Sequence, residues 1–286
     1  MFTLLVIAFD VLALTWSGVR ILRKSKEVNY SSGKYLAWGL ILLGIAIFSY
    51  GLRSIVIQFG PSFYWVDQLI FYRPGTVIHA TALFIAFSFV YKEFAPKLFA
   101  KITAIPVLGS MVYLAYLMAF APETRKVVEQ APLEPIKFRM TNYPFSSPIT
   151  AQVFLYITVG APLVILGIFL YNALKTEKLK ALFFGIGVPV ISFLGIVGMW
   201  KPAMLPFQLS SGTYKGLFVL AIILLLLSIF AAKNRKVMIK ALLYGLGISF
   251  QGLFIPLCIF ISPIFARLGY GIGALMVYKA FGTKVE

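Results

Sequence analysis

Residues 214–232 read YKGLFVLAIILLLLSIFAA, a run whose single charge, Lys215, lies at its start. A helix needs about 20 consecutive apolar residues to cross the hydrocarbon core of a bilayer. In lipid, a single chain segment can pair all of its backbone amides internally only as a helix. This run therefore predicts a transmembrane helix, and it indicates the class of the whole chain.

Apolar runs of this kind recur from one end of the sequence to the other. We predict an all-α fold, a polytopic transmembrane helix bundle of about nine spans that forms a single membrane domain over residues 1–286. The ninth run is short and contains Arg267, so eight spans remain the alternative. The runs lie near residues 2–22, 35–58, 74–91, 102–120, 149–172, 181–200, 214–232, 238–257 and 262–279.

The composition agrees with this class. Hydrophobic residues make up 60% of the chain and charged residues 12%, and the mean hydropathy is +0.93. A soluble domain is about half apolar and about a quarter charged. The excess apolar surface must face lipid or other membrane-embedded protein, so we expect a multi-pass protein of the cell membrane. Residues 1–22 are too long an apolar run for a signal-peptide core, and we interpret them as the first span.

The net charge of +17 comes from Lys and Arg clustered in short connections between the apolar runs. Cytoplasmic loops of membrane proteins carry such an excess of Lys and Arg. With the N-terminus outside and the C-terminus cytoplasmic, nine spans place 17 of the 26 basic residues on the cytoplasmic side. Eight spans would place 15 on the cytoplasmic side and 11 outside. The pattern favours the nine-span topology, anionic lipid headgroups as partners of the clusters, and no nucleic acid partner.

The longest connection is an extracytoplasmic loop at about residues 121–148. It contains several prolines and charges of both signs. Loops of this length are often functional. A lid, a docking surface and an ordered cap without a ligand all remain open for it.

An eight-residue motif occurs twice, 60 residues apart. Residues 180–187 read KALFFGIG and residues 240–247 read KALLYGLG, each at the start of a predicted outward-going span. One interpretation is a duplicated helical hairpin in parallel orientation, as transporters contain. The other is that every such helix needs a basic start and a glycine for close helix packing.

Three ionisable residues lie at similar predicted depth in the first three spans: Asp10, Arg53 and His79. From the helical rise, each is roughly 8–12 Å below the outer surface. Ionisable groups inside a membrane normally face the bundle and pair with one another. They form a candidate ligand or ion cluster, with Tyr50, Gln58, Asp67 and Arg73 as candidate bordering residues; the alternative is a structural Asp10–Arg53 pair.

A second group of candidates consists of helix breakers and neighbouring polar residues at equivalent repeat positions in the sixth and eighth spans. Broken helices can expose backbone carbonyls to a transported substrate. Proline and glycine also occur in spanning helices for packing reasons alone. The residues are Gly185, Gly187 and Pro189 in one span and Gly245, Gly247 and Gln251 in the other.

The residues needed for most catalytic sites are missing. His79 is the one histidine and Cys258 the one cysteine, so the chain alone has no bis-histidine haem site and no cysteine metal site. Walker A and Gly-x-Ser-x-Gly motifs are absent, and Asp and Glu do not cluster. We therefore expect no catalytic residues, no metal and no cofactor.

The function that fits these features best is a membrane-embedded binding or assembly subunit of a larger complex, with membrane-protein partners or a homo-oligomer. A transporter or channel that uses broken helices in spans six and eight is the alternative. A lipid-modifying enzyme is less favoured. A water-filled cavity between spans six and eight would favour transport, whereas a solid bundle with an apolar flank would favour a subunit.

Overall fold

The structure is a computed structural model of the 286-residue chain. It describes residues 2–56, 70–71, 73–95, 105, 108–109, 112–113, 116, 159–200, 202–260 and 263–282. Every element in these ranges is a helix, which confirms the all-α class predicted from the sequence.

The helices follow the predicted apolar runs closely. In chain order they are α1 (Phe2–Glu27), α2 (Ser31–Val56), α4 (Arg73–Glu93), α8 (Ala161–Ala173), α9 (Lys178–Leu182), η6 (Phe183–Gly187), α10 (Val188–Trp200), η7 (Pro202–Met204), α11 (Ser211–Ala231), α12 (Arg235–Phe260) and α13 (Pro263–Gly282).

Four helical segments are long and apolar enough to cross a membrane: Leu4–Glu27, Ser31–Arg53, Lys178–Met199 and Ser211–Ala231. Helices α4, α12 and α13 cover three further predicted runs. The predicted run 102–120 is described at single residues only, and the loop 121–148 lies outside the described residues.

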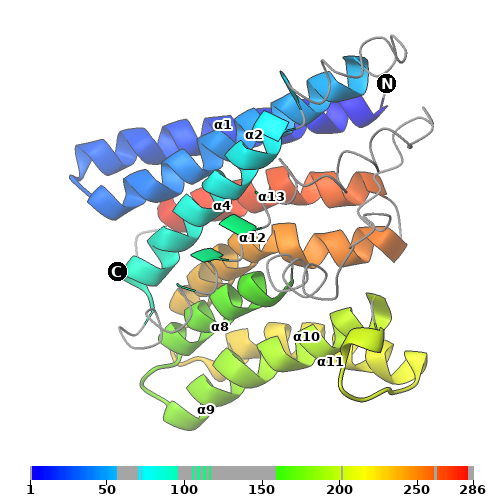
Figure 1. The fold of residues 1–286 in the computed structure, drawn as a ribbon. Coiled ribbons are helices and arrows are strands. Elements are labelled where there is room, and N and C mark those ends of the chain that lie inside the picture. The colour runs from blue at the N-terminus through cyan, green and yellow to red at the C-terminus, as the bar shows by residue number, and fades with distance from the viewer. Residues whose placement is uncertain are drawn as a thin grey trace.

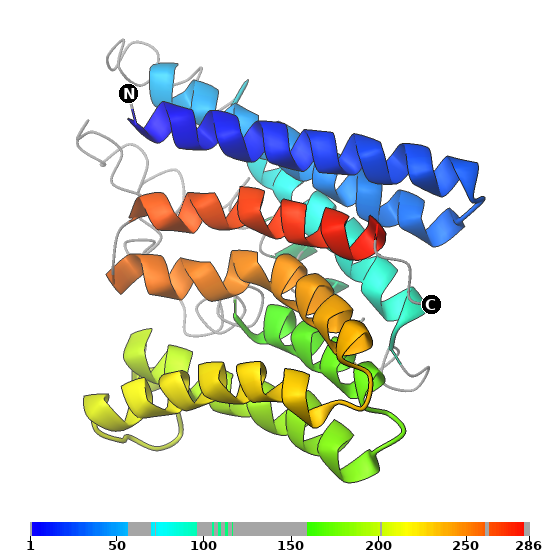
Figure 2. The same cartoon turned by 180° about the vertical axis from the view of Figure 1, so that it is seen from behind.

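The helices pack side by side in a row, except that α4 lies across it (Figure 1). Following contacts from neighbour to neighbour, the order is α4, α2, α1, α13, α12, α8, α10 and α11, and α4 also contacts α13 and α12 through the ring pairs His79–Tyr270 and Phe89–Tyr244. Figures 1 and 2 show this stack from opposite sides, with blue α1 next to red α13 and with α11 at the far edge. The N-terminal and C-terminal helices of the described chain therefore meet in the middle of the row.

Neighbouring helices have defined directions. Helices α1 and α13 run parallel, because Asp10 contacts Gly271 and, further along both helices, Trp16 contacts Tyr278 at 4.7 Å between ring centroids. The other neighbours in the row are antiparallel. In α2 and α4, for example, Gly39 lies against Ala86 and Gly75 against Tyr50.

The connections between these helices gather most of the described basic residues at one end of the row, which we call the basic end. It consists of the ends of α1, α4, α8, α11 and α13 and the starts of α2, α9 and α12. The turn from α1 to α2 shows how the chain reverses there. Tyr30 N donates to Ser25 O at 2.8 Å, and Asn29 adopts φ 49°. Asparagine tolerates this left-handed conformation better than most residues, and the bond pattern is a common helix end.

Two apolar clusters form the core, and α8 and α12 contribute to both. The first joins α1, α2, α4 and α13 to one side of α8 and α12. The second joins α10 and α11 to the other side. Near the basic end, Phe169 of α8 stacks on Tyr244 of α12 at 5.3 Å, and Asn172 Nδ2 donates to Phe94 O at 2.6 Å. These contacts make α8 the link between the two halves of the molecule.

Candidate functional site

Asp10 is completely buried in α1, where it faces the last helix of the described chain. Its Oδ1 accepts a hydrogen bond from the backbone amide of Gly271 in α13 at 2.9 Å. A Cβ at position 271 would lie 2.8 Å from that oxygen and 2.5 Å from the Phe9 ring. Glycine at 271 therefore allows the carboxylate to reach the backbone of a neighbouring helix.

His79 lies half-buried in α4, between two tyrosines from two other helices. Tyr50 Oη of α2 is 3.5 Å from His79 Nδ1, and the Tyr270 ring of α13 stands edge-on at 5.9 Å. Tyr270 immediately precedes Gly271, the partner of Asp10. The structure thus places Asp10 and His79 on helices that meet the same short segment of α13.

Arg53 is half-buried in the last turn of α2, three residues after Tyr50. Residues three apart share one side of a helix, so Arg53 and Tyr50 extend toward the same region. Of the residues expected to border the cluster, Arg73 begins α4, and Gln58 and Asp67 lie outside the described residues.

An imidazole and two phenols from three helices meet at His79, and the Asp10 carboxylate of a fourth helix bonds to the residue that follows Tyr270; we call these residues the Asp10–His79 cluster (Asp10, Tyr50, His79 and Tyr270). Such groups exchange protons and orient cations. Tyr270 is not among the residues predicted from the sequence, because a tyrosine in an apolar run has no charge to mark it. The available signal is Gly269-Tyr-Gly-Ile-Gly273, in which the tyrosine lies between glycines that favour close helix packing.

The two copies of the repeated motif contact opposite sides of α8. A Cβ at Gly185 would lie 2.8 Å from Tyr171 Cβ, and a Cβ at Gly245 would lie 2.8 Å from Leu166 Cδ1. Equivalent glycines of the motif therefore pack against one shared helix. Gly167 of α8 completes the closer contact, because a Cβ there would lie 2.3 Å from Gly185 O.

The second glycines of the motif have different surroundings. A Cβ at Gly247 would lie 2.9 Å from Gly273 O of α13, whereas a Cβ at Gly187 would meet only Phe183 of its own helix, at 3.7 Å. Ser249 Oγ donates to Pro162 O of α8 at 2.5 Å. Gln251 lies in α12.

The sixth predicted span continues through its glycines and proline without a break. Residues 183–187 form a π-turn, in which Val188 N donates to Phe183 O. Pro189 has no N–H, and its ring would clash with the carbonyl four residues earlier in a regular helix. A π-turn changes the hydrogen-bond register locally and relieves this conflict. Residues 243–247 of α12, the equivalent stretch, are α-helical.

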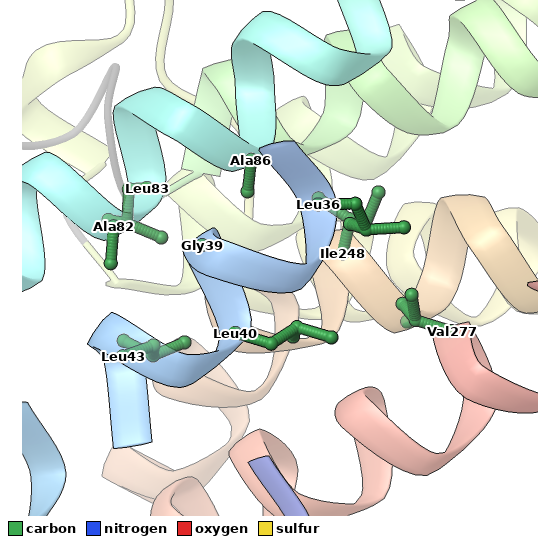
Figure 3. A pocket seen from close by; sticks show the side chains of 10 residues that line it. Leu36, Gly39, Leu40, Leu43, Ala82, Leu83, Ala86, Ile248 and Val277 are labelled. Carbon is green, nitrogen blue, oxygen red and sulfur yellow. The ribbon is translucent and has the colours of Figure 1, made fainter. Parts of the chain in front are cut away.

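A small apolar cavity lies between α2, α4, α12 and α13 (Figure 3). Its volume is about 20 Å³, and its lining includes Leu43, Ala82, Ile248 and Val277. This is room for about one water molecule, which would need two or more polar partners to be stable there. The apolar lining offers few such partners, so this part of the bundle is packed rather than open to a ligand.

Helix α11 is attached to the bundle by a narrow seam. Its buried residues are Tyr214, Ala221 and Ser228, which are seven positions apart. Only 17% of its most apolar stretch is buried, compared with 44–50% for the other three candidate spans. A Cβ at Gly216 would have no neighbour within 4 Å, and a Cβ at Gly212 would meet only Ser210, at 3.8 Å. Most of α11 is therefore an exposed apolar flank.

Within the described ranges, no group of three His, Cys, Asp or Glu side chains lies close enough to hold a metal ion. No family model matches the chain, and neither a curated protein nor a solved structure shows significant similarity to it. The features that bear on function are thus the Asp10–His79 cluster, the glycine contacts on both sides of α8 and the exposed flank of α11.

Proposed function

We propose that the chain is a nine-span protein of the cell membrane that acts as a binding or assembly subunit of a larger complex. The directions of the described helices support this topology. In chain order they alternate, provided that one further crossing lies between α4 and α8, which run in the same direction. The predicted run 102–120 occupies that place in the sequence.

Pairs of cationic and aromatic side chains support a cytoplasmic membrane boundary at the basic end. The Arg20 guanidinium lies 5.7 Å from the Trp16 ring, and the Lys92 ammonium lies 5.3 Å from the Tyr35 ring. Trp16 and Tyr35 are exposed. Exposed aromatic side chains next to Lys and Arg are typical of the headgroup level. The N-terminus is then outside and the C-terminus cytoplasmic.

The observation that carries the subunit role is the exposed flank of α11. Spanning helices associate through small residues that let two backbones approach closely. Gly212 and Gly216 are four residues apart on α11 and point to open space, whereas Gly195 and Gly198 of α10 already pack against α11. A partner helix crossing at Gly212 and Gly216 would meet no side chain that blocks close approach.

The test is purification of the full chain from its native membrane in a mild detergent. We expect a partner protein at a fixed stoichiometry, lost in the Gly212→Leu/Gly216→Leu variant because leucine fills the open surface. The control, Ile45→Trp, adds bulk to an exposed position of α2 and should retain the partner. A chain that purifies alone or only as a homo-oligomer would count against the proposal.

A transporter or channel is the second candidate, and the π-turn at residues 183–187 favours it, because π-turns inside helices are frequent at functional sites. Against it, the space between α10 and α12 is occupied by α8, with close glycine contacts on both sides. A lipid-modifying enzyme is the least favoured, because it would need clustered acids or histidines, and the sequence has nine acids and one histidine.

A further inference from the structure

Two turns that are far apart in sequence meet at the basic end beside α11. The first connects α8 to α9 and the second connects α11 to α12. Lys180 Nζ of α9, just after the first turn, donates to Ala231 O at the end of α11 at 3.0 Å and pairs with Glu177 of the first turn at 2.6 Å. The Lys180 hydrogen bond and charge, together with the charge of Lys233, hold the pKa of Glu177 below its usual range.

These turns concentrate positive charge, and we call the surface they form the lysine ledge. Its one acid, Glu177, is engaged by Lys180, so five cations remain in excess over the acids of the ledge. All six cations of the ledge are exposed, and they lie at the helix starts or in the turns. They are Lys175, Lys178, Lys180, Lys233, Arg235 and Lys236.

Exposed apolar side chains lie among these cations. Leu179, between Lys178 and Lys180, is 85% exposed. Phe230 is 68% exposed, and the Arg235 guanidinium lies 5.6 Å from its ring. Leu182 and Leu227 are also exposed, and they continue the apolar surface from the ledge along each helix. Cations at one level and apolar side chains directly beyond them match the phosphate and the acyl chains of a phospholipid.

We infer that the lysine ledge binds an anionic phospholipid of the cytoplasmic leaflet, with the headgroup phosphate among the lysines and the acyl chains against Leu182 and Leu227. This inference depends on the proposed membrane insertion but not on the subunit role. Five excess cations make the ledge complementary to a negative headgroup. Leu179 and Phe230 favour a lipid over a free phosphate, because a free phosphate has no apolar part to contact these exposed side chains.

The test is lipid retention by the full chain, reconstituted in nanodiscs of phosphatidylcholine with phosphatidylglycerol and then measured by native mass spectrometry. The ledge variant is Lys178→Gln/Lys233→Gln/Lys236→Gln. The control, Arg23→Gln/Lys26→Gln/Lys34→Gln, removes the same charge at the turn between α1 and α2. Each ledge cation beside the bound headgroup contributes about fivefold to its affinity.

We expect the ledge variant to retain phosphatidylglycerol at least tenfold less than the unmodified chain, and the control to change retention less than threefold. Equal loss in both variants, or no loss in the ledge variant, would overturn the inference. Displacement of the lipid by millimolar glycerol phosphate would show a site for free phosphate and would also overturn it. A chain that fails to insert into nanodiscs would instead contradict the proposed membrane protein itself.

Discussion

Asp10 Oδ1 accepts a hydrogen bond from the Gly271 backbone amide at 2.9 Å, although the two residues are 261 positions apart. This bond joins α1 to α13, the first and the last of the described helices in chain order. A buried carboxylate is costly unless it is hydrogen-bonded, so the contact both stabilises Asp10 and fixes the parallel packing of α1 against α13. The preceding residue of α13, Tyr270, has its ring 5.9 Å from the His79 ring.

Gly271→Ala should destabilise the protein. The new Cβ would lie 2.5 Å from the Phe9 ring and 2.8 Å from Asp10 Oδ1, so α13 must move or the hydrogen bond must lengthen. Overpacking of this kind costs about 1–3 kcal/mol. The measurement is the midpoint of thermal unfolding in one detergent. Gly282→Ala is the control, because a Cβ there has nothing within 4 Å; equal midpoints for the two variants would contradict the contact.

Gly185→Ala and Gly187→Ala should change stability in opposite directions, although the two glycines are two residues apart. A Cβ at Gly185 would lie 2.8 Å from Tyr171 Cβ and 3.2 Å from the backbone of α8. A Cβ at Gly187 meets only Phe183 at an ordinary distance, so alanine there gains about 1 kcal/mol of helix propensity. Thermal unfolding of both variants checks this. A Gly185→Ala variant that is as stable as the unmodified protein would refute the packing of α8 against the motif.

His79 offers a direct readout of the Asp10–His79 cluster, because it gives a single set of imidazole resonances. Tyr50→Phe removes the hydroxyl 3.5 Å from His79 Nδ1, and Tyr270→Leu removes the ring at 5.9 Å. Both variants should shift the imidazole signals in NMR spectra of the selectively labelled protein. Tyr278→Phe, whose ring contacts Trp16, should leave them unchanged. Unshifted signals in the first two variants would disprove the cluster.

Tyr30 should make the protein lose stability at high pH. Burial, and then the charge and hydrogen bond of Glu93, raise the pKa of Tyr30 in the folded protein. In the unfolded chain a tyrosine ionises near pH 10. Above about pH 10 the unfolded state releases the Tyr30 proton and the folded state keeps it. The free energy of unfolding is therefore at its full value below about pH 10 and decreases as the pH rises further. Unfolding midpoints at pH 9 and pH 11 should differ less for Tyr30→Phe than for the unmodified protein.

The apolar runs were sufficient to predict helices, because a continuous hydrophobic stretch of this length has one stable form in lipid. The pairing of α1 with α13 was not predictable, since no pattern near Asp10 indicates which distant amide it reaches. The π-turn at residues 183–187 was also missed. Gly185 and Pro189 predicted an irregularity, but whether the helix breaks or widens depends on how closely α8 approaches, which is a tertiary contact.

We propose α11 as a docking surface for a partner protein in the membrane. Ile223 of α11 and Ile45 of α2 are 46% and 45% exposed, so a photo-crosslinking amino acid placed at each position samples two flanks equally. In native membranes we expect the chain with the crosslinker at residue 223 to form one discrete adduct with another protein, and the chain with it at residue 45 to form none. Adducts with lipid alone at both positions would contradict the claim.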